Sequence, residues 1–274
     1  MTEGFWRLRG YWTGSSMNGL ARRRTLDLQP LGDSTSGVDQ AAAPGDITYT
    51  KTQRHALDPD VVARNLIVTG IGTDPISSAY KMLRTHVLQR MTANGWNVLA
   101  VTSPGAGEGK TLTALNLAIT MAREVTHTVL LVELDLQQPR LHDVLGYDLG
   151  PGMTDYLLRG TPLSEVMINP GIDRLVVIPA GRPVESASEL LSSPRMVDLV
   201  RELKERYPSR LVLFDVPPLL TSPEGLAFVP HVDAALLVVA EGHTAHEDVE
   251  VAKRMLASTH LLGAVMNRAS SYTT

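Results

Sequence analysis

The chain has 274 residues, of which 43% are hydrophobic and 20% charged, and its formal net charge is -4 at pH 7. This composition is typical of a globular protein, and the length suits one α/β domain with an extension, or two small domains. The sequence contains no cysteine, which excludes disulfides, cysteine-based zinc sites and thiol nucleophiles. A reducing compartment, the cytoplasm, is therefore expected.

The N-terminal segment differs from the rest of the chain in its hydrophobic periodicity. Residues 1–60 show no sustained helix or strand period, which predicts a flexible, disordered arm ahead of a domain over residues 61–274. Residues 1–24 hold five Arg, one Glu and several aromatic residues, a mixture that suits an anionic membrane surface or a partner. A disordered tail, or a start codon chosen upstream of Met17, explains the segment more simply.

The charge and hydropathy of the main segment exclude further classes. Residues 61–274 hold 18 basic and 22 acidic residues, so no nucleic-acid partner is expected. The longest uncharged apolar runs, such as Ala234–Ala240, fall far short of the ~20 residues that span a bilayer, and no signal peptide is evident. These features also favour a cytoplasmic protein.

Short apolar runs alternate with amphipathic stretches from about residue 61, as expected for a parallel sheet covered by helices on both faces. The predicted strands are Asn97–Ser103, Thr128–Leu134, Arg174–Pro179, Arg210–Asp215, Ala234–Ala240 and Leu261–Asn267. The predicted helices are Ile76–Thr92, Lys110–Glu124, Thr154–Leu158, Glu185–Leu191, Pro194–Tyr207 and Ala245–Ser258. The predicted fold class is therefore α/β with three layers.

A glycine-rich turn joins the first of these strands to a helix. The run Val98–Thr111 reads VLAVTSPGAGEGKT, close to the Walker A pattern, with Pro104 where the first glycine is usual. Small residues let successive backbone N–H groups surround phosphate oxygens at a helix N-terminus. Lys110 is then expected on the phosphates and the Thr111 hydroxyl on Mg²⁺. An ordinary glycine-rich turn is the alternative.

Acidic residues end two other strands. Glu133 and Asp135 share one face of a strand, and Asp215 ends another. Because parallel strands carry their carboxyl ends to one sheet edge, all three carboxylates are expected beside the metal of a bound nucleotide. A carboxylate after a single strand is more often a helix cap or a turn residue. Here carboxylates end two strands and both follow a Walker A sequence, which favours a metal site.

At this point the chain resembles the bacterial tyrosine kinases of capsular and exopolysaccharide systems, P-loop proteins related to the partition-type ATPases. The resemblance covers about Pro75 to Asn267. Besides Walker A, LLVELDLQQPRLH over 130–142 resembles Walker A′, and LFDVPP over 213–218 resembles that family's Walker B. The Ile76–Met91 helix resembles the family's subunit-contact helix, which implies a homo-oligomer.

The resemblance implies a P-loop fold, the cofactors ATP and Mg²⁺, and a role for each matching residue. Lys110 and Asp135 would be catalytic, while Thr111, Asp135 and Asp215 would hold Mg²⁺. Asn267 would lie by the base. The full set implied to contact ATP is Gly105, Gly107, Glu108, Gly109, Lys110, Thr111, Leu112 and Asn267.

The chain departs from the family pattern at several positions. Glu133 stands where Asp is usual, and Gln137 replaces a basic residue. The contact helix has Ser78 and Lys81 where an acidic residue and Arg are usual. In place of a tyrosine cluster the chain ends with one tyrosine, Tyr272, a possible phosphoacceptor.

These residues favour a cytoplasmic Mg-ATP-dependent tyrosine kinase that regulates polysaccharide chain length and export. Its partner would be a membrane chain-length or co-polymerase protein, which recruits it to the inner face of the membrane. One alternative is an ATP-gated regulatory subunit of that partner without kinase chemistry. Another is a partition-type ATPase, which Gly105 disfavours because it replaces that class's signature lysine. His243 and His246, three apart, suit a solvated helix start better than a metal site.

Overall fold

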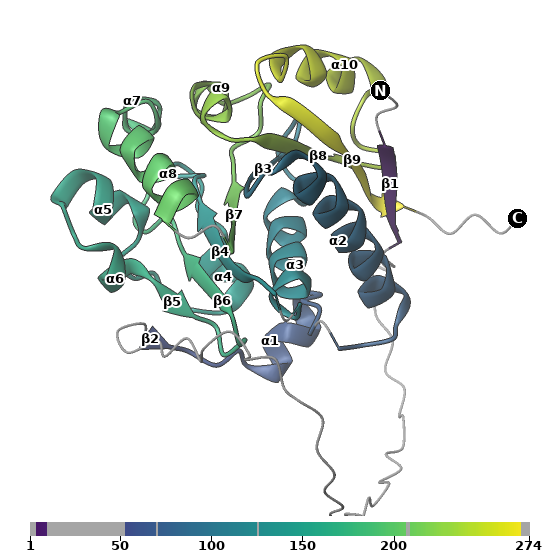
Figure 1. Cartoon of the computed structure of the whole chain (residues 1–274), viewed down its shortest axis with the longest axis horizontal. Helices are drawn as coiled ribbons and strands as arrows, with labels where there is room; N and C mark the ends of the chain where they lie inside the picture. Colours follow the sequence, from purple (N-terminus) through teal and green to yellow (C-terminus); the bar gives the residue numbers. More distant parts are fainter. Residues whose placement is uncertain (1–3, 10–52, 70, 125, 207–208, 270–274) are drawn as a thin grey trace, which may run out of the picture.

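A single large β-sheet organises the molecule (Figure 1). The computed structural model describes residues 4–9, 53–69, 71–124, 126–206 and 209–269. Its nine strands lie in the order β1-β9-β8-β3-β7-β4-β6-β5-β2, and every neighbouring pair is parallel except β5 and β6. The strands are β1 (Gly4–Arg9), β2 (Gln53–Arg54), β3 (Val98–Thr102), β4 (Thr128–Glu133), β5 (Ile168–Asn169), β6 (Leu175–Ile178), β7 (Arg210–Asp215), β8 (Ala234–Ala240) and β9 (His260–Ala269).

The helices cover both faces of this sheet. One face packs against α1 (Pro59–Arg64), α2 (Pro75–Asn94), α3 (Lys110–Ala122) and α4 (Leu141–Leu145). The other packs against α5 (Met153–Arg159), α6 (Leu163–Val166), α7 (Ala187–Leu191), α8 (Pro194–Arg206), α9 (Pro223–Phe228) and α10 (His246–Met255), with the 3₁₀ turn Val229–His231. In the described part of the chain, no helix is both long and apolar enough to cross a membrane.

The six predicted strands and six predicted helices are all confirmed, with ends that shift by a few residues. The central strands β3 and β8 are buried along their whole length, because a parallel sheet covered on both sides leaves neither strand face to water. The prediction of a three-layer α/β fold is therefore correct.

The structure also contains elements that the sequence did not predict. Strand β1 pairs in parallel with β9, and β2 pairs with β5, so two parts of the expected 1–60 arm join the sheet. Both lie at sheet edges, and β2 has only two residues, too few to show a period. Residues 10–52 lie outside the described residues, and the domain boundary at residue 60 stays a prediction.

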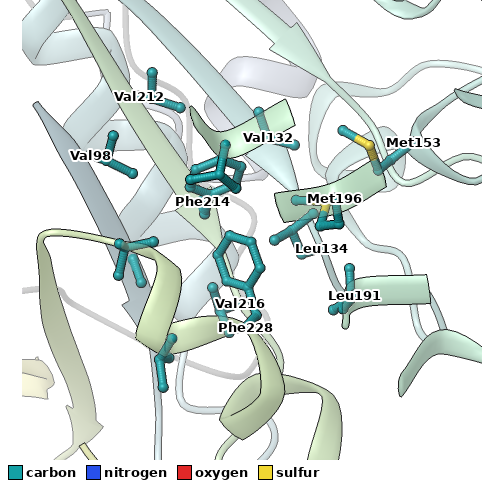
Figure 2. Packing of buried hydrophobic residues seen from close by; sticks show 14 of the residues in the cluster. Val98, Val132, Leu134, Met153, Leu191, Met196, Val212, Phe214, Val216 and Phe228 are labelled. Carbon is teal, nitrogen blue, oxygen red and sulfur yellow. The ribbon is translucent and has the colours of Figure 1, made fainter. Parts of the chain in front are cut away.

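The core between the sheet and α5–α9 is built around two aromatic side chains (Figure 2). The rings of Phe214 on β7 and Phe228 on α9 meet edge to face, with their centroids 4.8 Å apart. Both side chains are fully buried, and Val132, Leu134 and Met196 belong to the same cluster. Because Phe214 immediately precedes Asp215, this packing fixes the strand end that carries a candidate site residue.

Replacement of Phe214 by Ala is expected to lower the free energy of unfolding by about 3–5 kcal/mol, since it leaves a cavity in a fully buried cluster. Urea unfolding followed by circular dichroism measures this change. Leu158→Ala is the matched control because the Leu158 side chain is exposed, and its expected effect is below about 0.5 kcal/mol. A loss at Phe214 no larger than the loss at Leu158 would contradict this account of the core.

Candidate nucleotide site

Four predicted residues meet where β3, β4 and β7 end. The Lys110 ammonium at the start of α3 lies 2.8 Å from Asp135 Oδ2 and 3.8 Å from Asp215 Oδ1. The Thr111 hydroxyl donates to Asp215 Oδ2 over 2.6 Å. Asp135 lies just beyond β4, Asp215 ends β7, and Lys110 and Thr111 begin α3, so two strand ends and one helix start supply the cluster. These four residues converge as predicted.

The electrostatics of this cluster follow from its burial. Burial disfavours the charged form of Lys110, but the charges of Asp215 and Asp135 outweigh it and raise the pKa of the ammonium above its ordinary value. Burial also raises the pKa of Asp215, although Lys110 and the Thr111 hydroxyl oppose the shift. The site therefore holds one cation between two carboxylates in a position shielded from water.

The phosphate loop has the backbone that its glycines predict. Gly107 and Gly109 have φ values of +75° and +92°, which a residue with a Cβ rarely adopts. A Cβ on Gly109 would also lie 2.1 Å from the Asn267 side-chain nitrogen. The loop conformation therefore requires glycine at both positions. At Gly109 the side chain of Asn267, from the end of β9, also leaves no room for a Cβ.

The loop that follows Asp215 is hydrogen-bonded to the end of β3 and to the first residues of the phosphate loop. The Thr102 hydroxyl donates to the Pro217 carbonyl over 2.8 Å. The backbone N–H groups of Leu219 and Leu220 donate to the carbonyls of Ser103 and Pro104. The turn that contains Pro217 and Pro218 is therefore hydrogen-bonded to the start of the phosphate loop, which fixes the Walker A and Walker B segments relative to each other.

Glu133 has a structural role that its spacing does not predict. Its fully buried carboxylate accepts hydrogen bonds from the backbone N–H groups of Arg140, Leu141 and Ala180, at 2.5, 2.7 and 2.9 Å. In the described residues, no cluster of three His, Cys, Asp or Glu side chains could hold a metal ion. Glu133 ties the loop after β4 to the segment after β6, and its expected place beside the metal of a bound nucleotide stays a prediction.

The titration of Glu133 predicts a pH-dependent stability. Burial raises the pKa of Glu133 from 4.5 to about 7, the charge of Asp215 adds to this, and the three N–H groups oppose it. Because the folded chain binds this proton more tightly than the unfolded chain, the contribution of Glu133 to stability is present below pH 4.5 and is lost as the pH rises through 7.

Because of Glu133, the free energy of unfolding is expected to fall by roughly 3 kcal/mol between about pH 4.5 and pH 7.5. Urea unfolding across this range should show a flatter pH dependence in Glu133→Gln than in the unsubstituted chain. Glu205→Gln, at an exposed position, is the control and should leave the slope unchanged. Equal slopes in the chain and in Glu133→Gln would contradict the assignment.

Two contacts of the phosphate loop escaped the sequence prediction. The buried Glu108 carboxylate accepts from the Gly105 N–H at 3.1 Å and from the Thr244 hydroxyl at 2.6 Å, so it joins the loop to the segment before α10. The Arg268 guanidinium donates to the Gly107 carbonyl at 2.7 Å. Thr244 and Arg268 lie in no recognisable motif, and only the three-dimensional arrangement brings them to the loop.

The remaining predicted residues lie as follows. Leu112 is partly buried in the first turn of α3, and His243 and His246 are exposed. The Gln137 side chain donates to the buried carboxylate of Glu224 over 2.5 Å. Tyr272 lies outside the described residues.

The donor chemistry of the site suits Mg²⁺ with a nucleotide phosphate. Mg²⁺ prefers carboxylate and hydroxyl oxygens, and Thr111 with Asp215 offers both. Asp215 Oδ1 is buried and accepts no hydrogen bond, although the Lys110 ammonium lies 3.8 Å away. A cation beside Thr111 would satisfy this oxygen, so the residues present fit a Mg²⁺–nucleotide complex.

Comparison with known proteins supports this assignment of the fold and the loop. Residues 99–271 match the CobQ/CobB/MinD/ParA nucleotide binding domain. The chain is 31% identical to tyrosine-protein kinase YwqD of Bacillus subtilis over 206 residues, which cover 74% of this chain and 86% of that protein. It is also 31% identical to the putative tyrosine-protein kinase EpsB of Ralstonia solanacearum, with 74% of this chain matching only 27% of that longer protein.

Solved structures similar to this chain include a tyrosine kinase domain and a MinD protein. The kinase domain of the Escherichia coli tyrosine kinase ETK matches with a TM-score of 0.68 and 25% identity, over 83% of this chain and 88% of that one. MinD of Pyrococcus horikoshii, a septum site-determining protein solved with Mg-ADP, shares the fold with a TM-score of 0.51 and 22% identity, over 64% and 72% of the two chains. The chain belongs to the bacterial tyrosine-protein kinases, within the CobQ/CobB/MinD/ParA group of nucleotide-binding domains.

Proposed function

We propose that this chain is a Mg-ATP-dependent protein-tyrosine kinase whose site is built from Lys110, Thr111, Asp135 and Asp215. The observation that carries the proposal is the buried contact of Lys110 with Asp135 at the mouth of the phosphate loop, 2.8 Å long. It places a phosphate-binding cation and a proton-accepting carboxylate side by side. The family of the chain and the donor set of the site both support this reading.

Each residue has a role that its position allows. The N–H groups of 105–111 and the Lys110 ammonium would bind and orient phosphate oxygens, as helix N-termini do in P-loop proteins. Thr111 and Asp215 would hold Mg²⁺, with Asp135 beside it. Bound ATP would supply the phosphoryl group and leave as ADP, and Mg²⁺ would offset the negative charge of the phosphates. The Asp135 carboxylate would accept the proton of a tyrosine hydroxyl, because it lies beside the ammonium that would orient the phosphates.

The biological setting is part of the same proposal. We infer that the kinase regulates the chain length and export of capsule or exopolysaccharide with a membrane chain-length or co-polymerase protein, in the cytoplasm at the inner face of the membrane. Helix α2, with the exposed side chain of Met82, would be a contact between copies in a homo-oligomer. Tyr272 is the proposed phosphoacceptor of the chain itself.

A second function is favoured by one observation. Gln137 replaces the basic residue usual in the family, and its neutral amide satisfies one oxygen of Glu224, while Oε2 of Glu224 is buried without a partner. This altered Walker A′ loop suits a regulatory subunit that binds ATP and controls its membrane partner without phosphoryl transfer. A partition-type ATPase is a weaker alternative, because Gly105 replaces that class's signature lysine.

The test is incubation of the purified chain with γ-labelled ATP and Mg²⁺, with free phosphate and phosphotyrosine scored separately. The kinase proposal predicts labelled phosphotyrosine in the unsubstituted chain and none in Tyr272→Phe if the tail is the acceptor. The assay is repeated with the cytoplasmic part of the membrane partner present. Free phosphate alone in both assays would contradict the kinase and support an ATPase, and neither product would support the regulatory subunit.

A further inference from the structure

The end of β9 contacts the phosphate loop from outside, at two consecutive carbonyl groups. Asn267 donates from its side-chain amide to the Glu108 carbonyl over 2.9 Å, and Arg268 donates from its guanidinium to the Gly107 carbonyl over 2.7 Å. The Asn267 side-chain oxygen in turn accepts from the Arg268 N–H at 2.9 Å. The two side chains therefore form one hydrogen-bonded unit, which we call the 267–268 clamp.

The clamp acts on the orientation of the peptide units in the loop. A phosphate loop binds anions only when its N–H groups point inward, which requires its carbonyl groups to point outward. Those outward carbonyls need donors, and the clamp supplies one to each of Gly107 and Glu108. The Asn267 nitrogen also occupies the space that a Cβ on Gly109 would need. The hydrogen bonds and the close approach of Asn267 are therefore compatible with one conformation of the phosphate loop.

The backbone of Arg268 supports a positioning role. Its φ is +55°, in the left-handed region that costs a residue other than glycine energy. Because Asn267 Oδ1 binds the Arg268 N–H, this conformation is held by the clamp itself. Leu66 and Arg174 also have positive φ, but among these three residues only Arg268 donates a hydrogen bond to the phosphate loop.

We propose that Asn267 and Arg268 are positioning residues that hold the phosphate loop in its anion-binding conformation before nucleotide arrives. The inference rests on the nucleotide binding of the proposed function and differs from the sequence expectation, in which Asn267 lies by the base. The clamp acts through the loop carbonyls, so its effect is on phosphate affinity and on the order of the free loop.

Two measurements on the full chain test the clamp. Hydrogen–deuterium exchange without nucleotide reports the order of the peptide covering residues 104–111, and isothermal titration reports the affinity for Mg-ADP. Arg268→Ala is expected to speed exchange in that peptide and to weaken Mg-ADP binding about tenfold, the size of one hydrogen bond from a charged donor. Arg268→Lys, which keeps the charge and a donor, is expected to recover part of both effects.

The controls separate the clamp from general damage. Ala and Lys at 268 both keep a Cβ, so they carry the same left-handed backbone cost as Arg. Arg201→Ala removes an exposed guanidinium that pairs with Asp198 on α8, and it should change neither measurement. Exchange over α8 should remain unchanged in the Arg268 variants, which excludes loss of the fold.

The results that overturn the inference are distinct from those that overturn the proposed function. Unchanged exchange over residues 104–111 in Arg268→Ala contradicts the clamp, and a simultaneous loss of Mg-ADP affinity would make Arg268 a direct ligand contact instead. Failure of the unsubstituted chain to bind Mg-ADP contradicts the proposed function. Mg-ADP binding without phosphotyrosine contradicts the kinase while leaving the clamp intact.

Discussion

Phosphotyrosine formation is expected to fall at least about a thousandfold in Lys110→Met. Lys110 lies 2.8 Å from Asp135 and 3.8 Å from Asp215, so it is placed to offset the charges of the site and of the phosphates together. Preorganised cations of this kind supply much of the catalysis in phosphoryl transfer. Mg-ADP affinity should fall as well, because the same ammonium would bind the ground-state phosphates.

The design of this experiment must separate lost chemistry from lost folding. Removal of Lys110 leaves the buried Asp215 carboxylate without its cation, which by itself costs stability. Circular dichroism therefore accompanies the labelled-ATP assay. Lys253→Met, at a lysine that pairs with Glu250 on α10, serves as the control and should keep full activity. Wild-type phosphotyrosine yields in a folded Lys110→Met would contradict the role of the lysine.

Asp135→Asn is expected to lower phosphotyrosine formation by about 10²–10⁴-fold with little loss of Mg-ADP affinity. The amide keeps an acceptor for the Gln138 N–H, which Asp135 Oδ1 binds at 3.1 Å, but it cannot take up the proton of a tyrosine hydroxyl. It also removes the negative charge nearest Lys110, and Thr111 and Asp215 remain to hold Mg²⁺. Single-turnover transfer and calorimetric titration measure the two quantities.

The contrast between these two variants is what identifies the roles. Lys110→Met should weaken binding and transfer together, whereas Asp135→Asn should affect transfer selectively. Asp143→Asn, an exposed carboxylate on α4, is the matched control. A loss of Mg-ADP binding in Asp135→Asn equal to its loss of transfer would show a metal or phosphate ligand in place of a proton acceptor.

The sequence predicted the elements whose signals are local. Strands such as Ala234–Ala240 are uninterrupted apolar runs, and α3 begins at Lys110 directly after the glycine-rich turn. The contacts of Lys110 and Thr111 with Asp135 and Asp215 followed from one topological rule, that parallel strands end at a common edge. The two-residue strand β2 and the six-residue helix α1 carry too few positions for a clear period and were missed.

The rest of the site depends on contacts between residues far apart in the chain. Glu133 shares a strand face with Asp135, yet three backbone N–H groups from later segments bind it, and period 2 alone cannot reveal such partners. Arg268 and Thr244 likewise reach the phosphate loop through the fold. Spacing places side chains on faces, but hydrogen-bond partners across loops follow from tertiary structure.

A crystal structure of the chain with Mg-ADP tests the central claim most directly, that three strand ends and the start of α3 form one nucleotide site. The account predicts phosphates bound by the N–H groups of residues 105–111 and by Lys110. It also predicts Mg²⁺ beside Thr111 and Asp215, and Asn267 and Arg268 still bound to the loop carbonyls. Nucleotide bound elsewhere on the molecule, or at this edge with Lys110 still paired only to Asp135, would contradict it.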